Sequence, residues 1–187
     1  MIGFSAGGIP LMRRILSALP ENYPLAIVVV THFPSQHESH LAQILNDITP
    51  LSVSLAMDKQ VVAANKVYLA PPDYHLLIEK HSAALPTFAL SVDEPVKSVR
   101  PSIDVLFESA AEVYESALIA VLLSGANSDG AAGMDYVKQL GGLCIVQSPE
   151  ESEFDAMTRA AIDRVNVDYV ATLDEIISLL LSVQERE

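Results

Sequence analysis

The chain has 187 residues, half of them hydrophobic, and a formal net charge of −13 at pH 7. This length and composition predict a single domain with a sizeable buried core. The acidic charge, without any cluster of basic residues, disfavours nucleic acid and anionic membrane surfaces as partners. No apolar run reaches the roughly 18–20 residues that span a bilayer, and the first residues lack the pattern of a secretory signal. We therefore expect no nucleic acid partner and no membrane insertion.

Apolar runs alternate with helix-like stretches along the chain. In chain order, we expect a short strand at 1–4, a helix at 9–19, a strand at 25–31, a helix at 36–46, short strands at 52–55 and 66–69, a hairpin of 74–79 with 88–92, a helix at 103–114, a strand at 118–123, a helix at 131–140, a strand at 143–147, a helix at 156–164, a short strand at 169–171 and a helix at 173–183. This alternation predicts an α/β fold with a doubly wound, mostly parallel sheet and helices on both faces. The expected architecture is a Rossmann-like three-layer sandwich with an antiparallel hairpin at one edge.

Three polar residues stand where three of the apolar runs end. Ser5 follows the first run, His32 closes the run at 25–31, and Asp129 lies in the turn after the run at 118–123. Ligand sites in open parallel sheets form outside the carboxyl ends of the strands. A nucleophile, a base and a carboxylate that orients the base would then converge on one rim. The leading hypothesis is a serine hydrolase.

Ser5 lies in a G-x-S-x-G pattern at residues 3–7, which is typical of a nucleophile on a sharp strand-to-helix turn. The alternatives are a plain glycine-rich turn and a phosphate-binding loop. A dinucleotide site is disfavoured, because the G-x-G-x-x-G pattern is absent and no acidic residue ends the strand at 25–31. The chain order Ser, His, Asp also differs from the Ser, Asp, His order of the α/β-hydrolases.

Each partner of Ser5 also has a simpler interpretation. His32 could simply be a strand-end histidine that is hydrogen-bonded to backbone, and Asp129 could simply be the N-cap of the helix at 131–140. His32, His37 and His40 could together suggest zinc, but no cysteine or acidic ligand is arranged near them. Cys144, the single cysteine, lies in an apolar strand and is expected to be an inert core residue. One cysteine excludes an intramolecular disulfide and fits a cytoplasmic location.

Six segments in order resemble the catalytic domain of the chemotaxis protein-glutamate methylesterases, the CheB family. Residues 3–8 (GFSAGG) resemble its nucleophile segment, and residues 100–107 (RPSIDVLF) resemble its R-P-S-[VI]-D-x-L-F stretch. The other matching segments are 31–34, 70–75, 124–133 and 153–161. Together they extend over nearly the whole chain, which makes the combined resemblance specific.

The resemblance implies that Ser5 is the nucleophile, His32 the general base and Asp129 the residue that orients it. It further implies that the amides of Ala6 and the Ala126 region hold the oxyanion. By the same analogy His75 lines the pocket; its simpler interpretation is a histidine at a strand edge. The implied reaction is hydrolysis of glutamate γ-methyl esters, with deamidation of some glutamines, on the cytoplasmic helices of chemoreceptors. No metal or organic cofactor is expected, and a monomer is the default expectation.

The chain departs from the family pattern at several positions. Ala126-Asn127 stands where Met-Gly is usual, Ala6 replaces the commoner threonine, and residues 156–158 replace Gly-Met-Pro. The family normally carries an N-terminal receiver domain, and we expect residues 1–187 to form the catalytic domain alone. Whether the protein stands alone or is cut from a longer one stays open. The departures motivate an alternative, a catalytically impaired interaction domain on the same scaffold; a weaker one is an esterase of small molecules.

Overall fold

The computed structural model describes residues 1–32 and 38–183. Its centre is a seven-stranded sheet in the order β3-β4-β2-β1-β7-β8-β9, in which every neighbouring pair is parallel. The strands of this sheet are β1 (Ile2–Phe4), β2 (Ile27–Thr31), β3 (Ser52–Leu55), β4 (Lys66–Leu69), β7 (Ile119–Leu122), β8 (Leu143–Gln147) and β9 (Tyr169–Ala171). The predicted α/β class and parallel sheet are confirmed.

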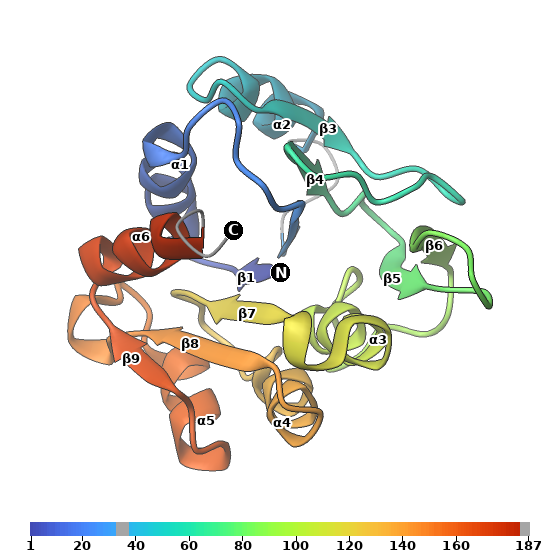
Figure 1. Ribbon diagram of the computed structural model, residues 1–187. Coiled ribbons are helices and arrows are strands. Elements are labelled where there is room, and N and C mark those ends of the chain that lie inside the picture. Colours follow the sequence, from blue (N-terminus) through green and yellow to red (C-terminus); the bar gives the residue numbers. More distant parts are fainter. Residues whose placement is uncertain (33–37, 184–187) are drawn as a thin grey trace.

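Helices cover both faces of the sheet (Figure 1). The helices are α1 (Gly8–Ala18), α2 (Glu38–Asn46), α3 (Ile103–Tyr114), α4 (Ala131–Gln139), α5 (Ala156–Arg164) and α6 (Leu173–Leu181). One core contains residues of α1, α2 and α6, and the other contains residues of α3, α4 and α5. Successive residues of β2 alternate between the two cores, with Val28 and Val30 in one and Val29 in the other, as the period of a strand requires. The three-layer sandwich is therefore confirmed.

The order of the strands places a switch point at β1. The chain runs from β1 outward through β2 toward β3 and β4, then returns to β7 on the other side of β1 and continues to β8 and β9. The carboxyl ends of β1, β2 and β7 consequently lie next to one another. In open α/β sheets this is the place where ligands bind.

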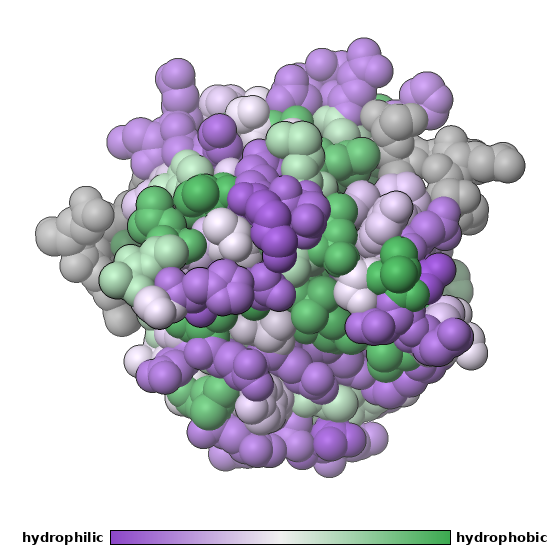
Figure 2. All heavy atoms as spheres, turned by 90° about the vertical axis from the view of Figure 1, so that its right-hand side faces the viewer, coloured by the Kyte–Doolittle hydropathy of each residue, from purple (hydrophilic) through white to green (hydrophobic). Residues whose placement is uncertain are grey.

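The predicted hairpin forms as β5 (His75–Glu79) and β6 (Thr87–Ser91), which pair antiparallel. It is a separate two-stranded sheet rather than part of the main one. Its inner side packs on the second core, where the rings of Tyr68 and Phe88 meet edge to face with centroids 4.8 Å apart. Figure 2 shows the face on this side of the molecule, where apolar residues are interrupted by hydrophilic ones. The hairpin thus extends the core without lengthening the parallel sheet.

Local signals account for several element ends. The Ser102 hydroxyl accepts a hydrogen bond from the Val105 amide and caps α3. A capping box of Thr172 and Glu175 begins α6, and Gly141, at φ +84°, follows the end of α4. Cys144 is buried in β8, and burial raises the pKa of its thiol to about 12, as an inert core residue requires. No helix in the described ranges combines the length and the apolar character needed to cross a membrane.

Candidate functional site

Ser5 and His32 leave neighbouring strands side by side. In the parallel pair of β1 with β2, Phe4 is in register with Thr31, so Ser5 and His32 are the next residues of their two chains. On the other flank of β1, Gly3 is in register with Leu122 of β7, whose loop leads to Asp129. The structure therefore brings all three predicted residues to one edge of the sheet.

The turn that carries Ser5 is held by the loop after β7. The Ser5 amide donates to the Ser124 carbonyl at 2.9 Å, and the Ser124 hydroxyl lies 2.9 Å from the carbonyl of Ala6, to which it can donate. Gly7, at φ +77°, closes the turn immediately before α1. A Cβ atom there would lie 3.0 Å or less from Ser124 and Glu153, so glycine is required both by conformation and by space. Hydrogen bonds with Ser124 thus fix the backbone at Ser5, the candidate nucleophile, and at the residue that follows it.

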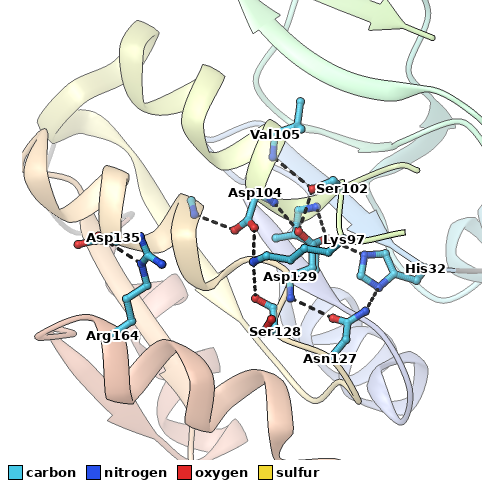
Figure 3. Close-up of polar contacts among 12 residues, drawn as sticks. His32, Lys97, Ser102, Asp104, Val105, Asn127, Ser128, Asp129, Asp135 and Arg164 are labelled. Atoms are coloured by element: carbon cyan, nitrogen blue, oxygen red, sulfur yellow. Dashed lines mark hydrogen bonds and ion pairs between the residues drawn. The ribbon is translucent and has the colours of Figure 1, made fainter. Parts of the chain in front are cut away.

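Asp129 is fully buried, and hydrogen bonds surround its carboxylate (Figure 3). Oδ1 accepts from the Ser102 hydroxyl at 2.8 Å and from the Asp104 amide at 3.1 Å, while Oδ2 accepts from the Ile103 amide at 2.6 Å. Nε2 of His32 lies 2.8 Å from Oδ2. Burial raises the pKa of Asp129, but these hydrogen bonds outweigh burial, so that the pKa lies below its ordinary value. The carboxylate is therefore ionised at neutral pH.

The simpler interpretation of Asp129, a cap for the helix at 131–140, is wrong. The residue before α4 is Gly130, at φ +94°, and no side chain caps that helix. Asp129 instead accepts from the first two amides of α3, where the aligned peptide dipoles favour an anion. The start of α3 thus anchors both carboxylate oxygens, including Oδ2, which His32 also contacts.

His32 lies between Asp129 and Asn127 (Figure 3). An ionised carboxylate only accepts hydrogen bonds, so Nε2 carries the ring hydrogen and donates to Asp129. The other ring nitrogen, Nδ1, lies 3.3 Å from the Asn127 amide nitrogen. Ser5 Oγ forms no hydrogen bond with any residue that the structure describes, so the Ser–His bond of the expected triad is not made here. Such bonds are often longer in the absence of substrate.

A lysine that the sequence analysis did not single out braces the loop that carries Asp129. Lys97 Nζ lies 2.7 Å from Asp104 Oδ2 and donates to the Ser128 carbonyl at 3.0 Å. Asp104 is buried and accepts from the Gly133 amide at 2.8 Å. Lys97 and Asp104 therefore tie together the segment before α3, the start of α3 and the loop before α4. No sequence motif pointed to Lys97, whose two contacts lie 7 and 31 positions further along the chain.

The candidate oxyanion donors lie in two adjoining loops. Ala6 follows Ser5 in the β1 turn, and Ala126 lies in the loop after β7. No acceptor in residues 1–32 or 38–183 takes the amide hydrogen of either residue. Both amides can therefore donate to a ligand at this edge. Their joint fit to an oxyanion stays a prediction.

His75 and the other histidines take different positions. His75 begins β5, is buried, and its Nε2 lies 3.1 Å from the Glu94 carbonyl oxygen, which is a hydrogen bond to backbone. Its place in the pocket stays a prediction. Of the histidines considered for zinc, His37 lies outside the described residues and His40 is an exposed residue of α2. Within the described ranges no three metal-ligating side chains gather at one point.

Comparisons with known proteins find relatives of this chain over nearly its whole length. The family model described as CheB methylesterase matches residues 1–180. A curated relative from Leptospira interrogans is 44% identical over 99% of this chain and 94% of its own length. A relative from Thermotoga maritima, named protein-glutamate methylesterase/protein-glutamine glutaminase, is 36% identical over 91% of this chain, which spans about half of that protein (49%).

A solved structure has the same fold as this chain. The crystal structure of the Thermotoga maritima CheB methylesterase catalytic domain superposes with a TM-score of 0.93 at 35% identity. The match covers 97% of this chain and 96% of that domain. The likeness therefore extends over the whole sandwich and is not limited to the motifs. This chain belongs to the CheB methylesterase family.

Proposed function

We propose that the protein hydrolyses glutamate γ-methyl esters on the cytoplasmic helices of methyl-accepting chemoreceptors. Its site would use Ser5 as the nucleophile, His32 as the general base and Asp129 as the carboxylate that orients the base. We infer the methylesterase activity from the names of the relatives of this chain. The observation that carries the assignment is the 2.8 Å contact between His32 and Asp129, at the strand end next to Ser5.

The first half of the reaction forms an ester between the substrate and the enzyme. As Ser5 Oγ attacks the ester carbonyl carbon, its proton passes to Nδ1 of His32, the ring nitrogen that Asp129 leaves free. Asp129 stabilises the imidazolium that results, because its charge faces Nε2–H. The Ala6 and Ala126 amides would stabilise the oxyanion; one such donor typically contributes about 2.7–4 kcal/mol to lowering the barrier.

Collapse of this intermediate breaks the bond to the methoxy oxygen. His32 returns its proton to that oxygen, and methanol leaves. Water then attacks the acyl-enzyme, with His32 again taking the proton, and releases a glutamate γ-carboxylate and free Ser5. A glutamine side chain would react by the same steps with ammonia as the leaving group. Both proposed reactions use the same three side chains and the same two backbone amides.

Release of methanol from a methylated chemoreceptor fragment tests this proposal. The wild-type protein should release methanol catalytically, and Ser5→Ala should abolish the release while circular dichroism shows an unchanged fold. Ser128→Ala is a matched control, because Ser128 is an exposed serine beside the site whose carbonyl, not its hydroxyl, is hydrogen-bonded. Unchanged release by Ser5→Ala would discard the assignment of the nucleophile. We expect a cytoplasmic monomer, which size-exclusion chromatography of the purified protein would test.

Two observations favour the alternative of a non-catalytic interaction domain. Ser5 Oγ is not bonded to His32, and Asn127 occupies the position where the family pattern has glycine. An interaction domain would bind the same receptor fragment stoichiometrically without releasing methanol. Binding and turnover measured on one fragment therefore separate the two functions.

A further inference from the structure

Asn127 contacts both members of the His–Asp pair. Its side-chain oxygen accepts from the Asp129 amide at 3.1 Å, and its side-chain nitrogen lies 3.3 Å from Nδ1 of His32 (Figure 3). The Asp129 amide can only donate, so it fixes which end of the Asn127 side chain is the oxygen. The NH2 group must then face His32.

An NH2 group facing Nδ1 fixes the tautomer of the imidazole. Nδ1 must be the nitrogen with the lone pair, which leaves the hydrogen on Nε2, where Asp129 accepts it. Asn127 and Asp129 therefore impose the same tautomer from opposite sides of the ring. This is the tautomer in which His32 can accept a proton from Ser5.

The same contact also competes with Ser5. Nδ1 has one lone pair, and the hydrogen bond from Asn127 uses it. The Ser5 hydroxyl has to displace that hydrogen bond before it can transfer its proton. Once Nδ1 carries a proton, the NH2 group of Asn127 faces another donor, which opposes the protonated ring. This accounts for a serine hydroxyl that is not bonded to the histidine beside it.

We propose that Asn127 is a positioning residue that holds His32 in the Nε2–H tautomer and covers its Nδ1 atom until substrate brings Ser5 into line. This inference rests on the proposed triad and adds a residue that restrains the base, His32. The oxygen of Asn127 serves the loop through the Asp129 amide, and its nitrogen serves the base. The two functions can be separated by substitution at this one position.

The rate at which a fluorophosphonate probe labels Ser5 tests the inference without a receptor substrate. Asn127→Gly removes the competing donor, so labelling should be faster by about fivefold, equivalent to roughly 1 kcal/mol, the size of one net hydrogen bond. Asn127→Asp keeps an acceptor for the Asp129 amide but places a carboxylate next to Nδ1 of His32. This negative charge favours a proton on Nδ1, so that Nδ1 cannot accept the proton of Ser5. Labelling at neutral pH should then be slower than in wild type. Nitrogen NMR shifts of His32 should show Nδ1 losing its hydrogen-bond donor in Asn127→Gly.

The two substitutions should change the labelling rate in opposite directions, which distinguishes the proposed role of Asn127 from a merely structural one. Asn46→Gly is the matched control, because Asn46 also accepts a backbone hydrogen bond (from Val53, 3.0 Å) but lies at the end of α2. It should not change the labelling rate. The proposed role of Asn127 would be overturned if Asn127→Gly and Asn127→Asp were both labelled at the wild-type rate, or both more slowly. If Ser5→Ala stayed unlabelled in the same experiment, the triad would remain intact. Labelling that persists in Ser5→Ala would instead refute the triad itself.

Discussion

Nε2 of His32 and Oδ2 of Asp129 lie 2.8 Å apart, although 97 positions separate the two residues in the chain. The carboxylate also accepts from Ser102, Ile103 and Asp104 at the start of α3. Its position is therefore fixed by the fold independently of the histidine. Asp129 can orient His32 because it is itself held by groups that do not take part in proton transfer.

Asp129→Asn should reduce both activity and stability. The substitution removes the charge that stabilises the imidazolium and places an NH2 group among donors. Methanol release should fall by about 10⁴-fold, by analogy with the same change in serine proteases. The free energy of unfolding should fall by about 2–3 kcal/mol, because buried donors lose their acceptor. Urea denaturation and steady-state kinetics measure the two effects, and a folded variant within tenfold of wild-type activity would contradict the role of Asp129.

The stability that Asp129 contributes should depend on pH. Its pKa is lower in the folded protein than the ordinary value of 3.8, so folding favours the ionised form. The contribution is present above 3.8 and is lost as the pH falls through the folded value. The difference in unfolding free energy between wild type and Asp129→Asn should therefore be smaller at about pH 3 than at about pH 7. A difference of the same size at both pH values would show that the hydrogen bonds do not favour the ionised form.

Lys97→Met should loosen the loop that carries Asp129. The substitution leaves the buried Asp104 carboxylate without its cation and leaves the Ser128 carbonyl with the Ala131 amide as its donor. Because the Lys97 side chain is 39% exposed, solvent screens the pair, and we expect a loss of only about 1–2 kcal/mol in unfolding free energy. Methanol release should fall several-fold through kcat rather than KM. Lys97→Arg, which keeps the charge, should recover most of both; equal loss in the two variants would argue against an electrostatic role.

Gly7→Ala should impair the turn that carries Ser5. Gly7 has φ +77°, and a Cβ atom would lie 2.9 Å from the Ser124 hydroxyl oxygen. Gly141→Ala provides the control, because Gly141 has φ +84° but its Cβ would meet Ser116 at an ordinary 3.6 Å, far along the chain from the site. Both substitutions should cost about 1–2 kcal/mol of stability through backbone strain. Only Gly7→Ala should also reduce methanol release. Equal losses of activity in both variants would mean that catalysis does not depend specifically on the turn at Gly7.

The positions of Ser5 and His32 could be predicted because they depend on local patterns. Continuous apolar runs indicated β1 and β2, and residues that directly follow parallel strands share one edge of the sheet. The ends of most elements agree with expectation to within two residues; the first two residues of the helix expected at 36–46 lie outside the described ranges. The hairpin was also expected, although its separation from the main sheet depends on packing against the core around Phe88.

The contacts of Asp129, Asn127 and Lys97 could not be predicted in the same way. Sequence alone allowed Asp129 to cap the helix that follows it, and only the packing of α3 against this loop decides otherwise. Asn127 was recognisable as a departure from the family pattern, but its contact with His32 joins positions 95 apart. Lys97 gave no signal, since its partners become neighbours only in the folded chain.

A covalent bond between substrate and Ser5 is the most direct test of the catalytic account. Wild-type protein would be mixed with a methylated receptor fragment, quenched in acid during the first turnover and mapped by mass spectrometry. We predict a glutamyl adduct on the peptide that contains Ser5, formed together with a burst of one methanol per enzyme molecule. Steady methanol release with no adduct, or with an adduct on another residue, would contradict the account.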